Sequence, residues 1–397
     1  MLFEKWSEVV ARSGDRVALW EAGSGKKVTF GELDDQAGRC EQSGDVWRVD
    51  GDSPEFFANL IAAWRNRKPL VLMEDHRHVL RPIEGDLPGG TSLIKQACGA
   101  SGLERSLFFG EEEVWAEARR NIVGLGLVPE RPGLAAISLA HSYGFGCLVL
   151  PLLLGGIPLH IVPAPLPMFM ETALNQEEKV FLPGVPAIWK TWWKTGVTGH
   201  AAIDLALSAG APLSKEMEHG AFEESGLKIH NFYGTSETGA IAYDRLGGLR
   251  EEEGEVGGLL PGVKVEVADD GRLLVASDSQ AIGADRRLCD DEFEGGLYRT
   301  TDEARFTGGR LILTGSVAGA INVAGRKVSP SRIERALLAV PGVEGARVGK
   351  SLSPDFERFE EICVTVTTGL EKKILRDSLR KTLESWEMPR HWEIIPR

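Results

Sequence analysis

Residues 179–232 read KVFLPGVPAIWKTWWKTGVTGHAAIDLALSAGAPLSKEMEHGAFEESGLKIHNF, and this stretch decides the fold. Short apolar runs typical of buried strands alternate in it with helical patterns. The expected elements, strand and helix in turn, lie at 179–182, 185–194, 203–208, 214–224 and 227–232. Repeated strand–helix units predict a largely parallel sheet, with ligands at the carboxyl ends of its strands.

An uncharged segment lies upstream of this stretch. Residues 132–170 contain no Asp, Glu, Lys or Arg, and their length alone would allow a membrane span. Prolines and a pair of glycines interrupt the segment, so we interpret it as a strand at 134–139, a helix at 143–154 and a strand at 158–162. It therefore predicts more of the buried sheet and no integral membrane association.

The pattern changes downstream of residue 260. Two alternating runs flank the turn sequence Ala268-Asp269-Asp270-Gly271, which predicts a hairpin over 263–276. After the Gly-containing break at 315–319, strands and helices mix in an α+β pattern. Its elements are expected around 321 and at 330–338, 344–348, 361–367 and 371–386.

We therefore expect an α/β protein of two domains, since 397 residues are too many for one compact core. The large N-terminal domain, 1–314, would hold strand–helix units around mainly parallel sheets. The small α+β C-terminal domain would occupy 315–397.

Composition narrows the class of partner. The formal net charge is −13, which argues against nucleic acid as the main partner. The five cysteines form no CxxC pair, so we expect reduced thiols and no structural zinc. The first residues, MLFEKW, carry charges where a secretion signal needs an apolar core, so we expect a cytoplasmic protein.

The residues after the strand at 227–232 can carry phosphate chemistry. Residues 231–239 read NFYGTSETG. Tyr233 can stack on a base, Gly234 allows close backbone approach, and Thr235 can reach a phosphate. The Glu237 carboxylate suits Mg²⁺, which prefers oxygen ligands. The alternative interpretation is a polar strand-to-helix turn.

A second acidic segment lies some sixty residues later. Residues 297–305 read LYRTTDEAR. Asp302 could accept both hydroxyls of a ribose, and Arg305 could face a phosphate. The alternative is an ordinary surface Asp and Arg.

Together the two segments resemble the YGxTE and YxTGDxxR patterns of the adenylate-forming superfamily. Acyl- and aryl-CoA synthetases, firefly luciferase and peptide-synthetase adenylation domains belong to it. Four more segments resemble family patterns in the family's order. They are AHSYG at 140–144, SAGAPL at 208–213, GEVGGLLPGV at 254–263 and GRKVSPSRIE at 325–334.

The resemblance implies a role for each matched residue. Tyr233 would stack on adenine, and Gly210, Ala211 and Gly234 would line the same slot. Thr235 would touch the α-phosphate, and Glu237 would hold Mg²⁺. Asp302 would bind ribose, and His141 would border the carboxylate substrate.

The phosphate loop departs from the family pattern. Residues 97–105 read ACGASGLER where the family has TSGTTGxPK. The backbone around Ser101 and Gly102 could still cradle phosphate, and Arg105 replaces the loop lysine. The alternative is a plain loop before a helix.

Two further departures concern the small domain. The hinge segment 315–322 lacks the family's Arg and Asp, and 389–397 matches the strand just before the family's catalytic lysine. We therefore expect no C-terminal catalytic lysine in this sequence.

The resemblance implies an AMP-forming acid–thiol ligase. It would use ATP and Mg²⁺ to activate a small carboxylic acid as an acyl-adenylate. The acyl group would then pass to a thiol, of CoA or of a phosphopantetheinyl carrier protein. The alternative is a catalytically weak relative that binds nucleotide or acyl groups as an accessory subunit.

Overall fold

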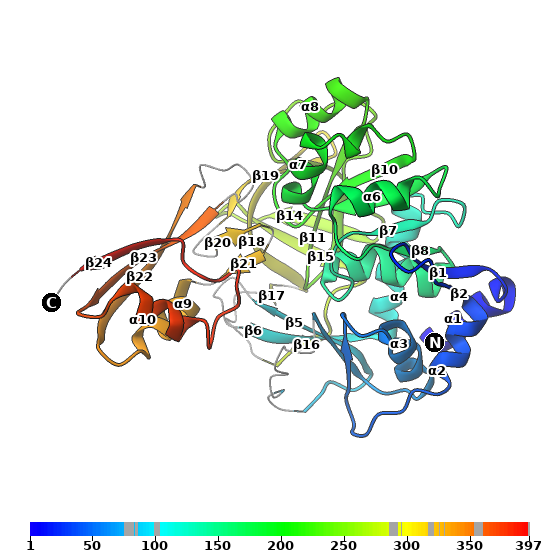
Figure 1. The fold of residues 1–397 in the computed structure, drawn as a ribbon, viewed down its shortest axis with the longest axis horizontal. Coiled ribbons are helices and arrows are strands. Elements are labelled where there is room, and N and C mark those ends of the chain that lie inside the picture. The colour runs from blue at the N-terminus through cyan, green and yellow to red at the C-terminus, as the bar shows by residue number, and fades with distance from the viewer. Residues whose placement is uncertain are drawn as a thin grey trace.

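A computed structural model describes residues 1–74, 83, 86–98, 104–285, 293–294, 296–316, 321–324, 326–328, 330–352 and 360–395. The chain forms a large body and a smaller part that ends in β24 and stands away from it (Figure 1). Ser101 and Gly102 lie outside the described residues.

One half of the largest sheet is parallel. Its strands pair in the order β1–β8–β7–β9–β10–β11, and every pairing along this path is parallel. The strands are β1 (Val17–Glu21), β7 (Gly133–Ala135), β8 (Leu159–Ile161), β9 (Val180–Gly184), β10 (Ile203–Ser208) and β11 (Ile229–Thr235). The short strand β2 (Lys27–Thr29) adds to β1 in the antiparallel sense.

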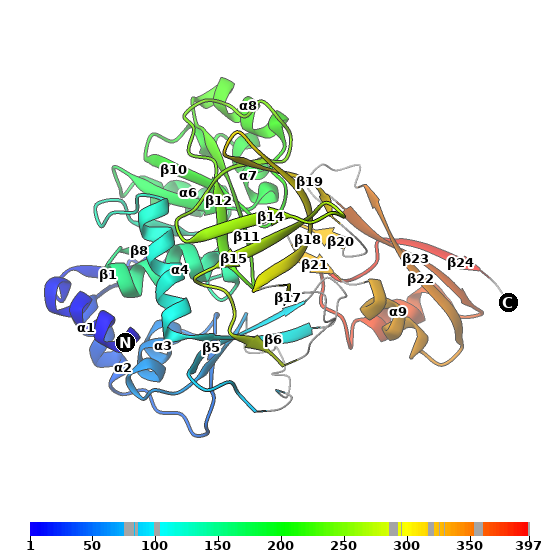
Figure 2. The ribbon, with the colours of Figure 1, turned by 180° about the vertical axis from the view of Figure 1, so that it is seen from behind.

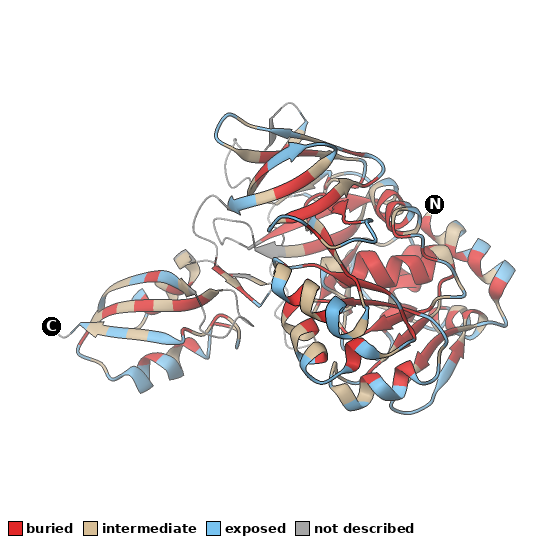
Figure 3. Ribbon diagram, turned by 90° about the horizontal axis from the view of Figure 1, so that it is seen from above, coloured by how far each residue is buried: buried red, intermediate tan, exposed pale blue. Residues whose placement is uncertain are grey.

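Helices cover both faces of this half, as the strand–helix alternation predicted. On β9, Phe181 packs into one core cluster, whereas Val180 and Leu182 pack into another on the opposite face. A strand that is buried on both faces is expected to be continuously apolar. Buried residues are accordingly concentrated in the interior of the large body in Figure 3.

The other half of the same sheet is antiparallel and continues from β11. Its strands pair in the order β12–β13–β19–β18–β15–β14, with β17 beside β18. They are β12 (Gly239–Tyr243), β13 (Glu255–Leu259), β14 (Val263–Val267), β15 (Arg272–Ser277), β17 (Phe293–Glu294), β18 (Leu297–Thr307) and β19 (Arg310–Ser316). The hairpin expected over 263–276 is confirmed as β14 and β15. The sheet is therefore mixed, and its two halves meet at β11.

A second sheet carries the segment before and after the phosphate loop. Its strands are β3 (Trp47–Asp50), β4 (Leu70–Met73), β5 (Thr91–Cys98), β6 (Glu104–Gly110) and β16 (Gly283–Ala284). β5 and β6 are antiparallel neighbours.

The helices of the large body are α1 (Leu2–Ser13), α2 (Phe30–Ala37), α3 (Phe56–Arg65), α4 (Glu111–Gly124), α5 (Ser142–Gly144), α6 (Pro167–Leu174), α7 (Pro186–Lys194) and α8 (Lys215–Ser225). Two π-helical turns, Phe145–Val149 and Pro151–Gly155, extend α5 and supply the helix expected at 143–154. Seen from behind, α4 runs beside the second sheet, the sheet that contains β5 and β6 (Figure 2). In the described residues, no helix is both long and apolar enough to cross a membrane.

The smaller part has its own core. The strands β22 (Val343–Leu352), β23 (Glu360–Thr368) and β24 (His391–Ile395) pair with each other, and α9 (Pro330–Leu338) and α10 (Lys372–Leu379) accompany them. Ile333 and Leu337 of α9 and Leu375 of α10 are buried in this core. A hairpin of β20 (Ile321–Val323) and β21 (Arg326–Val328) precedes it. The boundary near residue 315 stays a prediction.

One helix differs from expectation. The sequence predicted a helix over 371–386, but α10 ends at Leu379. Turns follow from Arg380 onward, and the Trp386 ring contacts the Arg326 guanidinium at 3.8 Å. A tertiary contact therefore replaces the last helical turns.

Candidate active site

Two residues expected to bind nucleotide meet although 69 positions separate them. The hydroxyl of Tyr233, on β11, donates a hydrogen bond to Oδ2 of Asp302, on β18, over 2.7 Å. Burial, and then the Asp302 carboxylate, raises the pKa of Tyr233 well above its ordinary value of 10, so the hydroxyl remains a donor. The contact fixes an aromatic ring beside a carboxylate that can accept ribose hydroxyls.

A buried ion pair lies next to them. Nη2 of Arg105, on β6, donates to Oε1 of Glu237 over 2.7 Å and to the hydroxyl of Tyr298 over 3.0 Å. The side chains of Arg105 and Glu237 are 1% and 10% exposed. The residues expected to face phosphate and Mg²⁺ therefore neutralise each other. Tyr298 lies in the quoted segment 297–305, but its sequence gave no sign of this bond.

The turn between β11 and β12 is held tightly. A Cβ at Gly234 would lie 2.6 Å from the carbonyl oxygen of Gly239, so close pairing of these strands requires glycine there. Thr235 Oγ1 accepts the N–H of Thr238 over 3.2 Å. Tyr233, Asp302, Arg105, Glu237 and Thr235 are called the nucleotide half of the site below.

Arg305 does not join this group. Its guanidinium pairs with Glu252, and both side chains are nearly half exposed. Among the residues we expected at the site, Arg305 is therefore placed on the surface of the antiparallel half.

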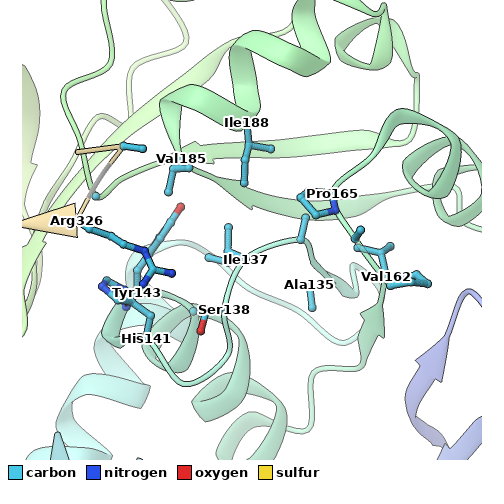
Figure 4. Close-up of a pocket in the computed structure, with 16 residues that line it drawn as sticks. Ala135, Ile137, Ser138, His141, Tyr143, Val162, Pro165, Val185, Ile188 and Arg326 are labelled. Atoms are coloured by element: carbon cyan, nitrogen blue, oxygen red, sulfur yellow. The ribbon is translucent and has the colours of Figure 1, made fainter. Parts of the chain in front are cut away.

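A cavity of about 470 Å³ lies beyond the carboxyl end of β7 (Figure 4). Most of its lining is apolar and comes from 135–138, 162–165 and α7 with the residue before it. Gly210, which follows β10, also lines it. The lining explains a difference from expectation: the strand expected at 134–139 ends at Ala135, because the following residues leave the sheet to form the cavity wall.

His141 supplies one polar group of this cavity. It precedes α5, and its Nδ1 accepts the backbone N–H of Tyr143 over 3.4 Å. Desolvation is the largest influence on its pKa and lowers it; Glu74 opposes this by raising the pKa, whereas Arg326 and Lys95 lower the pKa further. The imidazole is therefore neutral near pH 7.

Arg326 supplies the other polar group; the resemblance of its segment, 325–327, to part of the family's thioester-forming face had singled it out. It lies on β21, lines the cavity and points toward His141 in Figure 4. Its Nη1 donates to Oε2 of Glu74, just after β4, over 2.8 Å. The sequence signal was the GRKVSPSRIE resemblance, but the partner 252 positions away could not be found from it. The cavity lining with Arg326 and Glu74 is called the cavity half.

A buried charge pair behind the turn was also missed. Lys95 Nζ donates to Glu117 over 3.1 Å, with both side chains at most 5% exposed. Lys95 also lies over the Phe109 ring at 4.7 Å. The pair carries charge close to both halves of the site.

The Glu237 carboxylate has the chemistry that a magnesium ion requires. Mg²⁺ keeps several waters and takes one or two carboxylates plus substrate phosphates, so no cage of protein ligands is needed. Within the described residues, no group of three or more His, Cys, Asp or Glu side chains is arranged so that it could hold a metal ion. A buried carboxylate beside Thr235 meets that modest requirement, provided that Arg105 shares it.

Comparison with known proteins agrees with this geometry. The family model described as AMP-binding enzyme matches residues 117–281, which include His141, Gly210, Tyr233 and Glu237. Over this stretch the chain is similar to AMP-binding enzymes. The resemblance stated from the sequence is thereby confirmed.

Two curated relatives illustrate the range of AMP-binding enzymes to which the chain is similar. Long-chain-fatty-acid–CoA ligase FadD15 of Mycobacterium bovis is 34% identical over 39% of this chain and 28% of its own length. The chain thus spans little more than a quarter of that relative. The 4-coumarate–CoA ligase of Rhodobacter capsulatus is 28% identical over 81% of this chain and 79% of its own.

A solved AMP-binding enzyme shares the whole fold. The o-succinylbenzoate CoA synthetase (MenE) of Bacillus subtilis, a double mutant bound to the product analogue OSB-NCoA, is 16% identical. The match covers 99% of this chain and 95% of the synthetase chain, with a TM-score of 0.83. The complex of that synthetase with AMP gives 0.70 at similar coverage. The α/β class, with a large N-terminal and a small C-terminal part, is confirmed.

Proposed function

We propose that this protein is an AMP-forming acid–thiol ligase. It would activate a carboxylic acid with ATP as an acyl-adenylate and then pass the acyl group to a thiol. The observation that carries the proposal is the meeting of the Tyr233–Asp302 pair with a buried Glu237, beside a cavity that Gly210 borders. Sites at the carboxyl ends of neighbouring strands are where open α/β sheets bind ligands.

The nucleotide half would hold ATP through its sugar and its phosphates. Asp302 would accept the ribose hydroxyls, and Tyr233 would offer its ring to adenine, with Ala211 and Gly210 in the same slot. Thr235 would reach the α-phosphate. Ser101 and Gly102, outside the described residues, are proposed to cradle the outer phosphates.

Charge on the phosphates must be neutralised before a carboxylate can attack the α-phosphorus. Mg²⁺ would supply much of this charge when it is bound with ATP, held by Glu237. Arg105 would supply the rest from the other side of the same carboxylate. Sharing the carboxylate weakens both interactions, so we expect slow adenylate formation.

The cavity half would take the acyl group and the thiol. Neutral His141 accepts at Nδ1, so its Nε2 carries the proton and can donate to a carboxylate or carbonyl oxygen of the substrate. Small apolar side chains around it favour an uncharged acyl chain. CoA or a phosphopantetheinyl carrier protein would provide the thiol. ATP and CoA are cytoplasmic substrates, so we place the reaction in the cytoplasm.

The test is ATP–pyrophosphate exchange with acetate, octanoate, benzoate and 4-coumarate, followed by thioester assay with CoA. We expect exchange with at least one acid, and its loss in Asp302→Ala. Absence of both exchange and thioester, in a chain that still binds AMP, would contradict the ligase. That outcome would leave the accessory nucleotide-binding role.

A further inference from the structure

The large body and the smaller part meet at a charged contact on the cavity. Glu74 follows β4 in the large body, and Arg326 is the first residue of β21. Their side chains join over 2.8 Å and are 28% and 35% exposed. The contact therefore joins the two parts at the edge of the cavity, which Arg326 lines.

Two features hold Arg326 in this position. Its guanidinium lies 3.8 Å from the centre of the Trp386 ring, within the range of a cation–π contact. Two residues before it, Ala324 has a φ of +52°, a left-handed conformation that is unfavourable for a residue other than glycine. A stacked guanidinium on a constrained hairpin is preorganised to meet one partner.

We propose that Glu74 and Arg326 form a clasp that positions the smaller part for transfer of the acyl group to the thiol. This inference rests on the proposed ligase function and assigns positioning roles to two residues. The arrangement with the clasp superimposes better on the MenE complex with a CoA product analogue than on the MenE complex with AMP. Both structures are of one synthetase, so the better match supports an arrangement suited to the thiol step.

The reaction that the clasp serves is a simple exchange at the acyl carbon. The thiol loses its proton to solvent, and the sulfur forms a bond with the acyl carbonyl carbon. The bond from that carbon to the α-phosphate oxygen breaks, and AMP leaves. The clasp adds no chemical group to this step. The clasp fixes the wall of the cavity in which the acyl transfer takes place.

Among the residues that the structure describes, His141 on the large body faces Glu74 and Arg326, and Lys95 acts on His141. His141 is neutral near pH 7, so this side chain adds no charge that would offset the attraction between Glu74 and Arg326. A partly exposed pair is screened by salt, which makes its contribution tunable.

Charge reversal tests the clasp. We would prepare Glu74→Arg, Arg326→Glu and the double variant, with Arg347→Glu as the matched control. Arg347 is an exposed arginine of β22 that does not line the cavity, so its reversal changes net charge equally. Each variant is also checked for AMP affinity and thermal unfolding, so that loss of folding is recognised.

The kinetic readout is single-turnover thioester formation from supplied acetyl-, octanoyl-, benzoyl- and 4-coumaroyl-adenylate with CoA. Each single reversal should slow the reaction roughly tenfold, because it reduces the population of the competent arrangement. The double variant should recover to within about twofold of the native rate, and Arg347→Glu should match native. Singles at the native rate, or a double as slow as the singles, would overturn the clasp.

Small-angle X-ray scattering of the same proteins separates this inference from the proposed function. Each single reversal should give a more extended average shape, and the double variant should restore the native profile. Unchanged scattering in the singles would overturn the clasp even if the protein is a ligase. A native chain that forms thioester from none of the four adenylates would instead count against the proposed function.

Discussion

The two halves of the site are held together in different ways. In the nucleotide half, Tyr233, Asp302, Arg105 and Glu237 all belong to the large body, and the Arg105–Glu237 pair is almost fully buried. In the cavity half, Arg326 reaches Glu74 from the smaller part through a contact that is about one-third exposed. One half is internal to packed sheets, whereas the other is assembled across an interface.

Because of this difference, we expect the two halves to control different quantities: nucleotide affinity in one and the rate of acyl transfer in the other. A buried polar network resists salt and tolerates little change, because each member left without its partner carries a large desolvation cost. A half-exposed pair at an interface contributes little energy but selects one arrangement. We therefore expect changes in the nucleotide half to alter nucleotide affinity and stability. Changes in the clasp should alter the rate of acyl transfer.

The largest expected effect comes from breaking the buried pair. Arg105→Met leaves the Glu237 carboxylate buried without its cation, which should lower the free energy of unfolding by about 3 kcal/mol. Urea unfolding followed by tryptophan fluorescence measures this loss. Arg105→Met with Glu237→Met should recover most of it, because no uncompensated charge remains. Equal stability of native protein and Arg105→Met would refute a strong pair.

As the pH falls, the region around the cavity half should lose local stability at a higher pH than the nucleotide half. His160 lies on β8, next to the cavity wall at 162–165, and burial lowers its pKa to about 4. Glu177 Oε1 lies 3.4 Å from Nε2, but burial outweighs that contact and also raises the pKa of Glu177. The unfolded chain binds the extra proton below pH 6.5, so the free energy of unfolding falls between pH 6.5 and 4, by about 3 kcal/mol.

Hydrogen exchange across that pH range measures the acid effect. Amides of β8 should lose protection as the pH falls, while those of β11 retain theirs. In His160→Gln the pH dependence of β8 should flatten, because no buried base remains to titrate. Identical acid profiles in native and variant would exclude His160 as the cause.

Local pattern predicted much of this fold but none of its long-range pairs. The alternation over 179–232 and the hairpin over 263–276 follow from periodicity and turn residues, and the structure confirms them. The Tyr233–Asp302 and Glu74–Arg326 contacts join residues that no local pattern connects. The mutual neutralisation of Arg105 and Glu237 was missed for the same reason, although each residue had been singled out.

A smaller effect should follow from removing one hydroxyl in the nucleotide half. Tyr233→Phe keeps the ring but removes the donor to Asp302, so the carboxylate is less firmly oriented. We expect AMP affinity to fall about fivefold, or about 1 kcal/mol, as for one hydrogen bond to a charged group. Fluorescence titration with AMP would show this loss. A fall as large as that in Asp302→Ala would mean that the hydroxyl itself contacts the nucleotide.

The smallest expected effect is that of salt. Between 0.05 and 0.5 M NaCl, acyl transfer should slow a few-fold as the Glu74–Arg326 attraction is screened. Urea unfolding of the large body should change little over the same range, because its pairs are buried. The double charge reversal still has an ion pair at this contact, so the clasp predicts that its acyl-transfer rate responds to salt with the same sign and size. Persistence of the salt response in Arg326→Gln would not fit the clasp, since that variant has no pair to screen.

The account depends most on nucleotide binding between β11 and β18. Isothermal titration calorimetry with AMP tests it on the native chain, Asp302→Ala and Arg326→Glu. We predict one AMP per chain, affinity at least tenfold weaker in Asp302→Ala because ribose hydroxyls lose their acceptor, and native affinity in Arg326→Glu. Equal affinity of the native chain and Asp302→Ala, or no binding by the native chain, would contradict the account.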